Sequence, residues 1–150
     1  MKARSHFLLL TLLLGLDHTT KYLVEHTLSF YTEIPILSGL SLIKVHNFGA
    51  AYGILQNHPS FLLSISFSVL LFGWIYRHNL AQGTLGYIGL TVIASGALGN
   101  LIDRLFRGYV VDFLDIHIIP VFNIADILIN IGILCLVIDT IRSNNARKTH

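Results

Sequence analysis

The chain has little charge, a single cysteine and three prolines, and each scarcity excludes a class of protein. Asp, Glu, Lys and Arg make up 12 % of its 150 residues, about half the share found in soluble domains. One cysteine excludes an internal disulfide framework, and three prolines exclude a collagenous chain. A net charge of +2 is too small for a nucleic-acid-binding surface. With 53 % hydrophobic residues and no low-complexity tract, the composition excludes a disordered chain and indicates a membrane protein.

Four mostly apolar segments approach the length of about 20 residues that a helix needs to cross a membrane. The first begins after Lys2 and Arg4 like a secretory signal peptide, but no small-residue cleavage site follows it, so we interpret it as a retained span. No internal repeat or second domain is visible. We therefore expect residues 1–150 to form one all-α, membrane-embedded domain with four transmembrane helices. The expected spans cover approximately residues 7–24, 59–76, 85–102 and 118–141.

The distribution of basic residues predicts the orientation, because Lys and Arg are retained on the cytoplasmic side. Four spans place both termini on one side of the membrane. Six basic residues fall on that side and four fall on or towards the other, so we expect both termini to be cytoplasmic. The six are Lys2, Arg4, Arg77, Arg142, Arg147 and Lys148; the four are Lys21, Lys44, Arg104 and Arg107.

The outer segment between the first two spans contains a short alternating stretch from Ser41 to Val45. Asparagine and glycines then mark turns between Asn47 and Gly53. We expect a small extracytoplasmic strand or hairpin at the membrane surface. A plain connecting loop is the alternative.

Ionisable residues inside apolar spans need a reason, because each costs at least roughly 2.5 kcal/mol there. Asp17 and Lys21 lie four residues apart, so a helix places them on one face as an ion pair near the outer interface. The alternative is that the pair only neutralises itself and orients the first helix.

The third span carries small residues suited to close helix packing and ends in polar residues. The polar residues are Asn100, Asp103 and Arg104, at helical spacing. They can act as interface anchors or as part of a site. The small residues are Ser95, Gly96, Ala97 and Gly99.

Two acids follow at the same membrane face. Asp112 lies among hydrophobic residues in what we interpret as an apolar loop edge, Val110 to Asp115. Asp126 lies in the first turn of the fourth span, where Pro120 and Asn123 resemble a helix start and cap. Capping alone explains Asp126 but not a second acid fourteen residues earlier. Two carboxylates at an apolar interface suggest an aspartyl dyad, in which one acid holds a proton while its neighbour activates water.

Other catalytic arrangements are absent from the sequence. The eight histidines form no HExxH helix and no cluster with cysteine, although His18 and His26 share a helix face. There is no GxSxG elbow and no glycine-rich nucleotide loop, and Cys135 lies deep in an apolar run. We therefore expect neither a metal nor a cofactor.

Five ordered blocks resemble the motifs of the bacterial lipoprotein signal peptidases, also called signal peptidase II, over nearly the whole chain. His18 replaces the family's usual glutamine, and Tyr52 replaces its usual phenylalanine. The blocks are Asp17-His18-Thr19-Thr20-Lys21, Asn47-Phe48-Gly49-Ala50-Ala51-Tyr52-Gly53, Gly99-Asn100-Leu101-Ile102-Asp103-Arg104, Val110-Val111-Asp112-Phe113 and Phe122-Asn123-Ile124-Ala125-Asp126.

The resemblance implies a multi-pass aspartyl endopeptidase of the bacterial inner membrane, with an extracytoplasmic β-rich segment. Its implied partners are membrane lipids and lipid-modified prolipoproteins, which it would cleave just before the diacylglyceryl-modified cysteine. Asp112 and Asp126 would form the dyad. The residues that would position the substrate or orient the acids are Asn47, Asn100, Arg104 and Asn123. The residues that would support them are Asp17, Lys21 and Asp103.

Two other classes fit some of these residues. A small ion or solute transporter could place Asp17, Lys21, Asp103 and Asp126 along a path, although no repeated, interrupted span supports one. A non-catalytic membrane scaffold would explain the small-residue face but not the outer acids.

Overall fold

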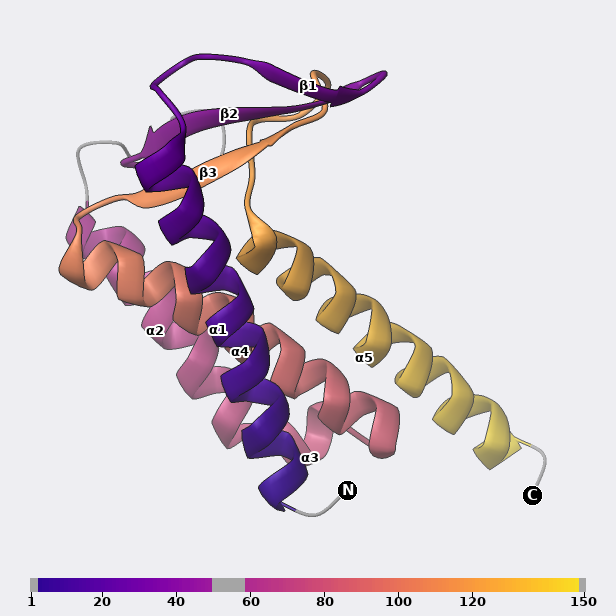
Figure 1. The fold of residues 1–150 in the computed structure, drawn as a ribbon. Coiled ribbons are helices and arrows are strands. Elements are labelled where there is room, and N and C mark those ends of the chain that lie inside the picture. Colours follow the sequence, from indigo (N-terminus) through magenta and orange to yellow (C-terminus); the bar gives the residue numbers. More distant parts are fainter. Residues whose placement is uncertain (1–2, 50–58, 149–150) are drawn as a thin grey trace.

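The computed structural model describes residues 3–49 and 59–148, which form a mostly helical protein with a small sheet at one end (Figure 1). Three described helices are long and apolar enough to cross a membrane, and a fourth apolar helix, α2, is shorter, at 17 residues. The elements in chain order are α1 (Ala3–Thr27), β1 (Ile34–Leu37), β2 (Leu40–Asn47), α2 (Pro59–Ile75), α3 (Arg77–Leu80), α4 (Thr84–Phe106), β3 (Val110–Asp115) and α5 (Ile124–Lys148).

Helix α4 is the centre of the helical part, because α1, α2 and α5 all pack against it. The predicted small-residue face makes this possible, and its four residues are buried. A Cβ on Gly96 would collide with the backbone of Ala125 in α5. A Cβ on Gly99 would collide with the carboxylate of Asp17 in α1. The absent side chains therefore let two helices approach α4 closely.

The three strands form an antiparallel sheet in the order β1-β2-β3. Strand β2 confirms the strand predicted from Ser41 to Val45. A small apolar core of Val24, Val111 and Phe113 joins the sheet to the end of α1. The chain from Ala50 to the end of the predicted turn at Gly53 lies outside the described residues.

Residues Val110–Asp115 are a strand, so our interpretation of this segment as a loop edge is wrong. Pairing with β2 explains the difference, since Val45 lies opposite Asp112 and His46 opposite Val111. Both faces of β3 are buried at its start, and Val110 and Val111 are 1 % and 0 % exposed. A strand covered on both faces shows no polar–apolar alternation that the sequence could reveal.

The fourth predicted span begins too early, because α5 starts at Ile124 and not near residue 118. Phe122 is held in extended backbone by hydrogen bonds with Leu114, from nitrogen to oxygen at 3.0 Å in one direction and 2.8 Å in the other. Pro120 therefore precedes the helix by four residues and does not lie in its first turn. The other predicted spans coincide with α1, α2 and α4.

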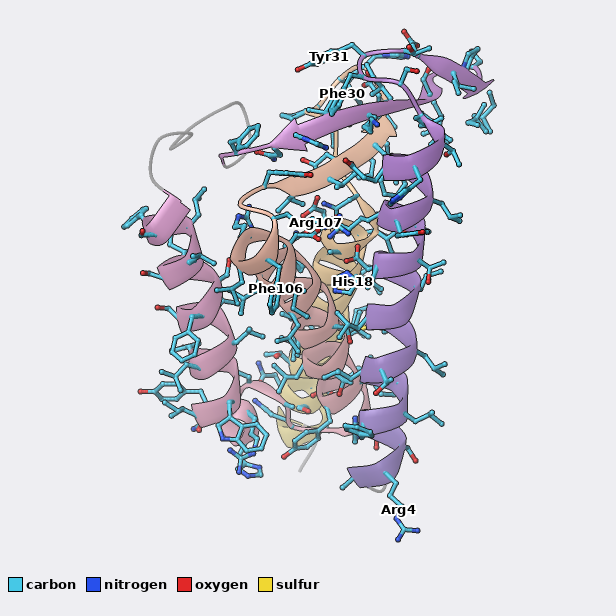
Figure 2. The ribbon with its side chains drawn as sticks, turned by 60° about the vertical axis from the view of Figure 1, so that its left-hand side comes forward. Arg4, His18, Phe30, Tyr31, Phe106 and Arg107 are labelled. Carbon is cyan, nitrogen blue, oxygen red and sulfur yellow. The ribbon has the colours of Figure 1, made fainter. Side chains whose placement is uncertain are left out.

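The sheet and the chain ends lie at opposite ends of the molecule. In Figure 1 the start of α1 and the end of α5 lie at the bottom, with α3 near them, and the sheet lies at the top. Figure 2 shows the same separation, with Arg4 at one end and Phe30 and Tyr31 at the other.

Candidate active site

The nine polar residues singled out from the sequence form one connected network where the helices meet the sheet. Five elements contribute to it, so residues as far apart in the chain as Lys21 and Asp103 come into contact. They are Asp17 and Lys21 from α1, Asn47 from β2, Asn100, Asp103 and Arg104 from α4, Asp112 from β3, and Asn123 and Asp126 from the start of α5.

Asp112 is held by two amide donors. Nδ2 of Asn47 donates to its Oδ2 at 2.8 Å, and Nδ2 of Asn123 donates to its Oδ1. Burial raises the pKa of Asp112 from 3.8 to about 6. The nearby Asp126 carboxylate also raises this pKa, while the hydrogen bonds from the two asparagines lower it. The side chain is 3 % exposed and can hold a proton in mildly acidic conditions.

Asp126 is half-buried in the first turn of α5. Nδ2 of Asn100 donates to its Oδ1 at 2.9 Å, and the backbone N–H of Asn123 donates to its Oδ2 at 3.1 Å. In return, the backbone N–H of Asp126 donates to Oδ1 of Asn123 at 3.1 Å. This reciprocal pair is a capping box, so the predicted asparagine cap is confirmed. The cap and the acid pair share residues, and one does not exclude the other.

Lys21 is the centre of a buried charge cluster. Its Nζ lies 2.8 Å from Oδ2 of Asp17 and 2.8 Å from Oδ2 of Asp103, and it donates to Oδ1 of Asn100 at 2.9 Å. The predicted pair of Asp17 and Lys21 is confirmed, but both side chains are 0 % exposed and the pair extends to α4. It therefore does more than neutralise itself, because it fixes one end of an amide that reaches Asp126.

Asp17 also joins α1 to the start of α5. Its Oδ1 accepts a hydrogen bond from the backbone N–H of Ala125 at 2.9 Å. This N–H belongs to the first turn of α5, where helix donors lack partners within the helix. A carboxylate there is also favoured by the helix dipole. Asp17 thus orients the helix that carries Asp126.

Arg104 supplies the positive charge beside the two acids. It interacts electrostatically with Asp112 and Asp126, and its Nη2 donates to the carbonyl oxygen of Gly49 at 3.3 Å. A fixed guanidinium at this position can stabilise negative charge on the acids or on a bound carbonyl group.

Sequence reasoning did not place His46 in the site, although this side chain stabilises the strand next to Asn47. Its Nε2 lies 2.9 Å from a carboxylate oxygen of Glu25, and its ring stacks on Tyr109 with 3.7 Å between centroids. The three residues tie α1, β2 and the start of β3 together. Their spacing in the chain carries no periodic signal, because three separate elements bring them into contact.

His18, which departs from the family motif, lies beside the charge cluster, with its Nδ1 3.7 Å from Oδ2 of Asp17. It lines a cavity of about 450 Å³ between α1 and α4, which Asp103 of the network also lines, together with Phe106 and Arg107 (Figure 2). Tyr52, the other departure, lies outside the described residues. Within residues 3–49 and 59–148, no three His, Cys, Asp or Glu side chains gather in a way that could hold a metal ion.

These features can support acid–base chemistry. Two carboxylates lie at the edge of an apolar helix bundle, each oxygen of each carboxylate accepts one hydrogen bond, and a cation stands beside them. A site of this kind in a bundle of apolar helices defines a membrane-embedded aspartic peptidase.

Comparisons with known proteins give the family. The family model described as signal peptidase (SPase) II matches residues 9–142. The lipoprotein signal peptidase of Bartonella quintana is 37 % identical over 99 % of this chain and 94 % of its own. That of Clostridioides difficile is 40 % identical over 89 % of this chain and 92 % of its own. A solved bacterial membrane enzyme structure, obtained by the in meso method at 2.3 Å resolution, superimposes with a TM-score of 0.86 at 28 % identity, over 95 % of this chain and 90 % of its own.

The chain belongs to the lipoprotein signal peptidase family, the signal peptidase II aspartic peptidases. Its activity is the removal of signal peptides from prolipoproteins. The predicted family and function are confirmed, and the transporter and scaffold alternatives are set aside.

Proposed function

We propose that Asp112 and Asp126 are the catalytic pair of this peptidase. The observation that carries the proposal is their common partner, Asn123. The side-chain amide of Asn123 donates to Asp112, and its backbone N–H donates to Asp126. One residue therefore sets the position of both carboxylates, which is what a reaction shared between two acids requires.

In the proposed reaction the pair holds one proton between its two carboxyl groups. The ionised aspartate removes a proton from water, and the water oxygen forms a bond to the carbonyl carbon of the scissile peptide. The protonated aspartate gives its proton to the carbonyl oxygen, which produces a neutral tetrahedral intermediate. Proton transfer to the amide nitrogen and return of the hydroxyl proton then break the C–N bond. The pair regains its single proton, so the reaction consumes only the peptide bond and one water molecule.

Arg104, Asn47 and Asn100 support this reaction without exchanging protons in it. Asn47 and Asn100 each donate to one carboxylate, Asp112 and Asp126 respectively, and so hold its oxygens in a fixed direction. Arg104 places a positive charge beside both acids. We assign these three residues to positioning of the acids and of the substrate.

The substrate is proposed to be a prolipoprotein whose cysteine already carries diacylglyceryl lipid, with cleavage just before that cysteine. The relatives named as lipoprotein signal peptidases support prolipoproteins as the substrate class. The position of the site supports the lipid: Asp112 and Asp126 lie where apolar helices meet the sheet, so a peptide can reach them while its acyl chains stay in the membrane.

We further propose that α2 is the fourth membrane span and that residues 1–150 act as one domain. In this arrangement both termini are cytoplasmic and the sheet is extracytoplasmic. Its support is the position of Arg4, Arg77 and Arg142, which all belong to the end of the molecule opposite the sheet (Figure 1). The site then faces the side on which exported precursors arrive.

The test is a cleavage assay on a diacylglyceryl-modified precursor and on its unmodified form. Asp112→Asn and Asp126→Asn should each abolish cleavage while the protein still accumulates in the membrane. Asp115→Asn is the matched control, because Asp115 ends the same strand but hydrogen-bonds to the backbone of His117 instead of the network. Activity in either of the first two variants would remove that residue from the pair. Equal cleavage of both precursors would remove the lipid requirement.

A further inference from the structure

A second cavity lies far from the two acids, at the end of the molecule that holds the chain ends. It has a volume of about 480 Å³ and lies between α1, α2 and α4. This volume falls within the range of roughly 300–1,000 Å³ that is usual for ligand sites. Half of its lining residues are aliphatic, and these include Leu10 from α1, Leu70 from α2, and Leu90 and Leu98 from α4.

The cavity is elongated along the helices. On α4 its lining extends from Tyr87 to Leu98, which at 1.5 Å per residue is about 16 Å along the helix axis. The three helices that form it are apolar, and their axes are aligned along the bundle (Figure 1). A hydrocarbon chain that lies parallel to the helices fits a cavity of this shape.

The polar groups of the cavity gather at its end near α3 and the start of α1. Arg77 donates to the carbonyl oxygen of Trp74 at 2.7 Å, and its guanidinium carbon lies 4.5 Å from the centre of the Trp74 ring. Nδ1 of His6 lies 2.9 Å from Oγ1 of Thr91, which ties α1 to α4 beside the cavity. Trp, Tyr and Arg at the end of an apolar span are typical of the level of lipid headgroups. The guanidinium has five N–H donors, so the bond to Trp74 leaves others for a ligand.

The charge at this end favours an anion. Arg4, Arg77 and Arg142 belong to it, and Asp139 is its one acid in the described part of the chain. Asp139 is 5 % exposed and is already occupied, because its Oδ2 accepts hydrogen bonds from the backbone N–H groups of Gln82 and Gly83. No exposed acid of this region therefore opposes a phosphate group beside Arg77.

We propose that this cavity binds one anionic phospholipid, with an acyl chain between α1, α2 and α4 and the phosphate group at Arg77. The bound lipid completes the packing of α1 and α2 on α4 at the end opposite the active site. This proposal is independent of the catalytic pair, because lipid binding is measured without any cleavage.

Two glycines allow a matched test of the cavity. A Cβ on Gly73 or on Gly15 would meet no atom within 4 Å, so neither position is closed to a side chain by a neighbouring atom at its Cβ. Gly73 lines the cavity, whereas Gly15 on α1 does not. Gly73→Phe should fill the cavity and lower binding at least tenfold, and the smaller Gly73→Leu should lower it less. Gly15→Phe should bind lipid as the wild type does.

The measurement is native mass spectrometry of the full chain, delipidated in detergent and titrated with phosphatidylglycerol or phosphatidylcholine. We expect one phosphatidylglycerol per chain and at least a tenfold preference over phosphatidylcholine. Arg77→Gln should abolish the preference, and Arg142→Gln, at the same end of the molecule, should keep it. Unfolding temperatures near that of the wild type show that each variant is folded.

Three results would overturn the proposal. The first is binding of phosphatidylglycerol to a folded Gly73→Phe variant at the level of the wild type. The second is an equal loss in Gly15→Phe, which would place the lipid elsewhere on the surface. The third is displacement of the lipid by a synthetic signal-peptide helix, which would make the cavity part of the substrate site.

Discussion

Lys21 determines which way the side chain of Asn100 points. The ammonium group of Lys21 can only donate hydrogen bonds, so the group that faces it at 2.9 Å must be the oxygen of the Asn100 amide. The NH₂ group of the same amide then faces Asp126 and donates to it at 2.9 Å. A buried charge on α1 thus fixes a hydrogen bond to an acid on α5 through one residue of α4.

Replacing this charge should affect both stability and activity. Lys21→Met keeps much of the side-chain volume but leaves the buried carboxylates of Asp17 and Asp103 without the ammonium group that they share. Removing one partner of a buried ion pair costs about 3–5 kcal/mol. We expect a lower unfolding temperature in detergent and a large loss of cleavage. Adding Asp103→Asn to Lys21→Met should restore part of the stability but not the activity, and a fully stable single variant would contradict this account.

Two substitutions of Asn123 separate its function as a helix cap from its hydrogen bond to Asp112. Asn123→Ser retains an oxygen that can cap α5 but removes the amide that donates to Asp112. A hydrogen bond to a charged group contributes about 1.5–3 kcal/mol to stability, so the unfolding temperature should fall, and cleavage should slow by about tenfold or more because Asp112 is held less firmly. Asn123→Ala also removes the cap and should lose about a further 1 kcal/mol of stability. Equal cleavage by the Ser variant and the wild type would show that the amide is not needed.

Because the pKa of Asp112 is raised in the folded protein, its contribution to the stability of the folded state depends on pH. In the folded protein this carboxyl holds its proton up to about pH 6, while its ordinary pKa is 3.8. Between these values the folded state binds more protons than the unfolded state, so the contribution of Asp112 to stability falls as pH rises from about 4 to above 6. Asp112→Asn lacks this fall. The unfolding temperature of the variant minus that of the wild type should therefore increase between pH 4 and pH 7, and a constant difference would contradict the shifted pKa.

The orientation can be tested by labelling in intact cells. In a Cys135→Ala background, Leu37→Cys introduces a thiol on the exposed first strand of the sheet, and Asn144→Cys introduces one near the end of α5. A membrane-impermeant maleimide should label residue 37 from outside. It should label residue 144 only after the membrane is opened. The reverse pattern would place both termini outside.

The helices and the composition of the site were predictable from the sequence because they depend on local patterns. Apolar runs showed α1, α2 and α4, and the four-residue spacing showed the pair of Asp17 and Lys21. What the sequence could not show depends on contacts between distant segments. Strand β3 exists because β2 pairs with it, and α5 begins at Ile124 because Leu114 holds Phe122 in extended backbone.

The same distinction applies within the site. Motif resemblance selected all nine residues of the network, but not which atoms meet. Tertiary packing brings together three sets of contacts: the cluster around Lys21, the contact of Gly99 with Asp17, and the pair of His46 and Glu25 next to Asn47. Asp139 was missed as well, since its role is to cap the start of α4 from another helix.

The capping box at the start of α5 links the folding of this helix to the arrangement of the two acids. Asn123 begins the helix and also holds both proposed catalytic acids, so the first turn of α5 cannot unwind without separating them. If the two acids are the catalytic pair, as we propose, a chain whose α5 has not docked should not cleave its substrate.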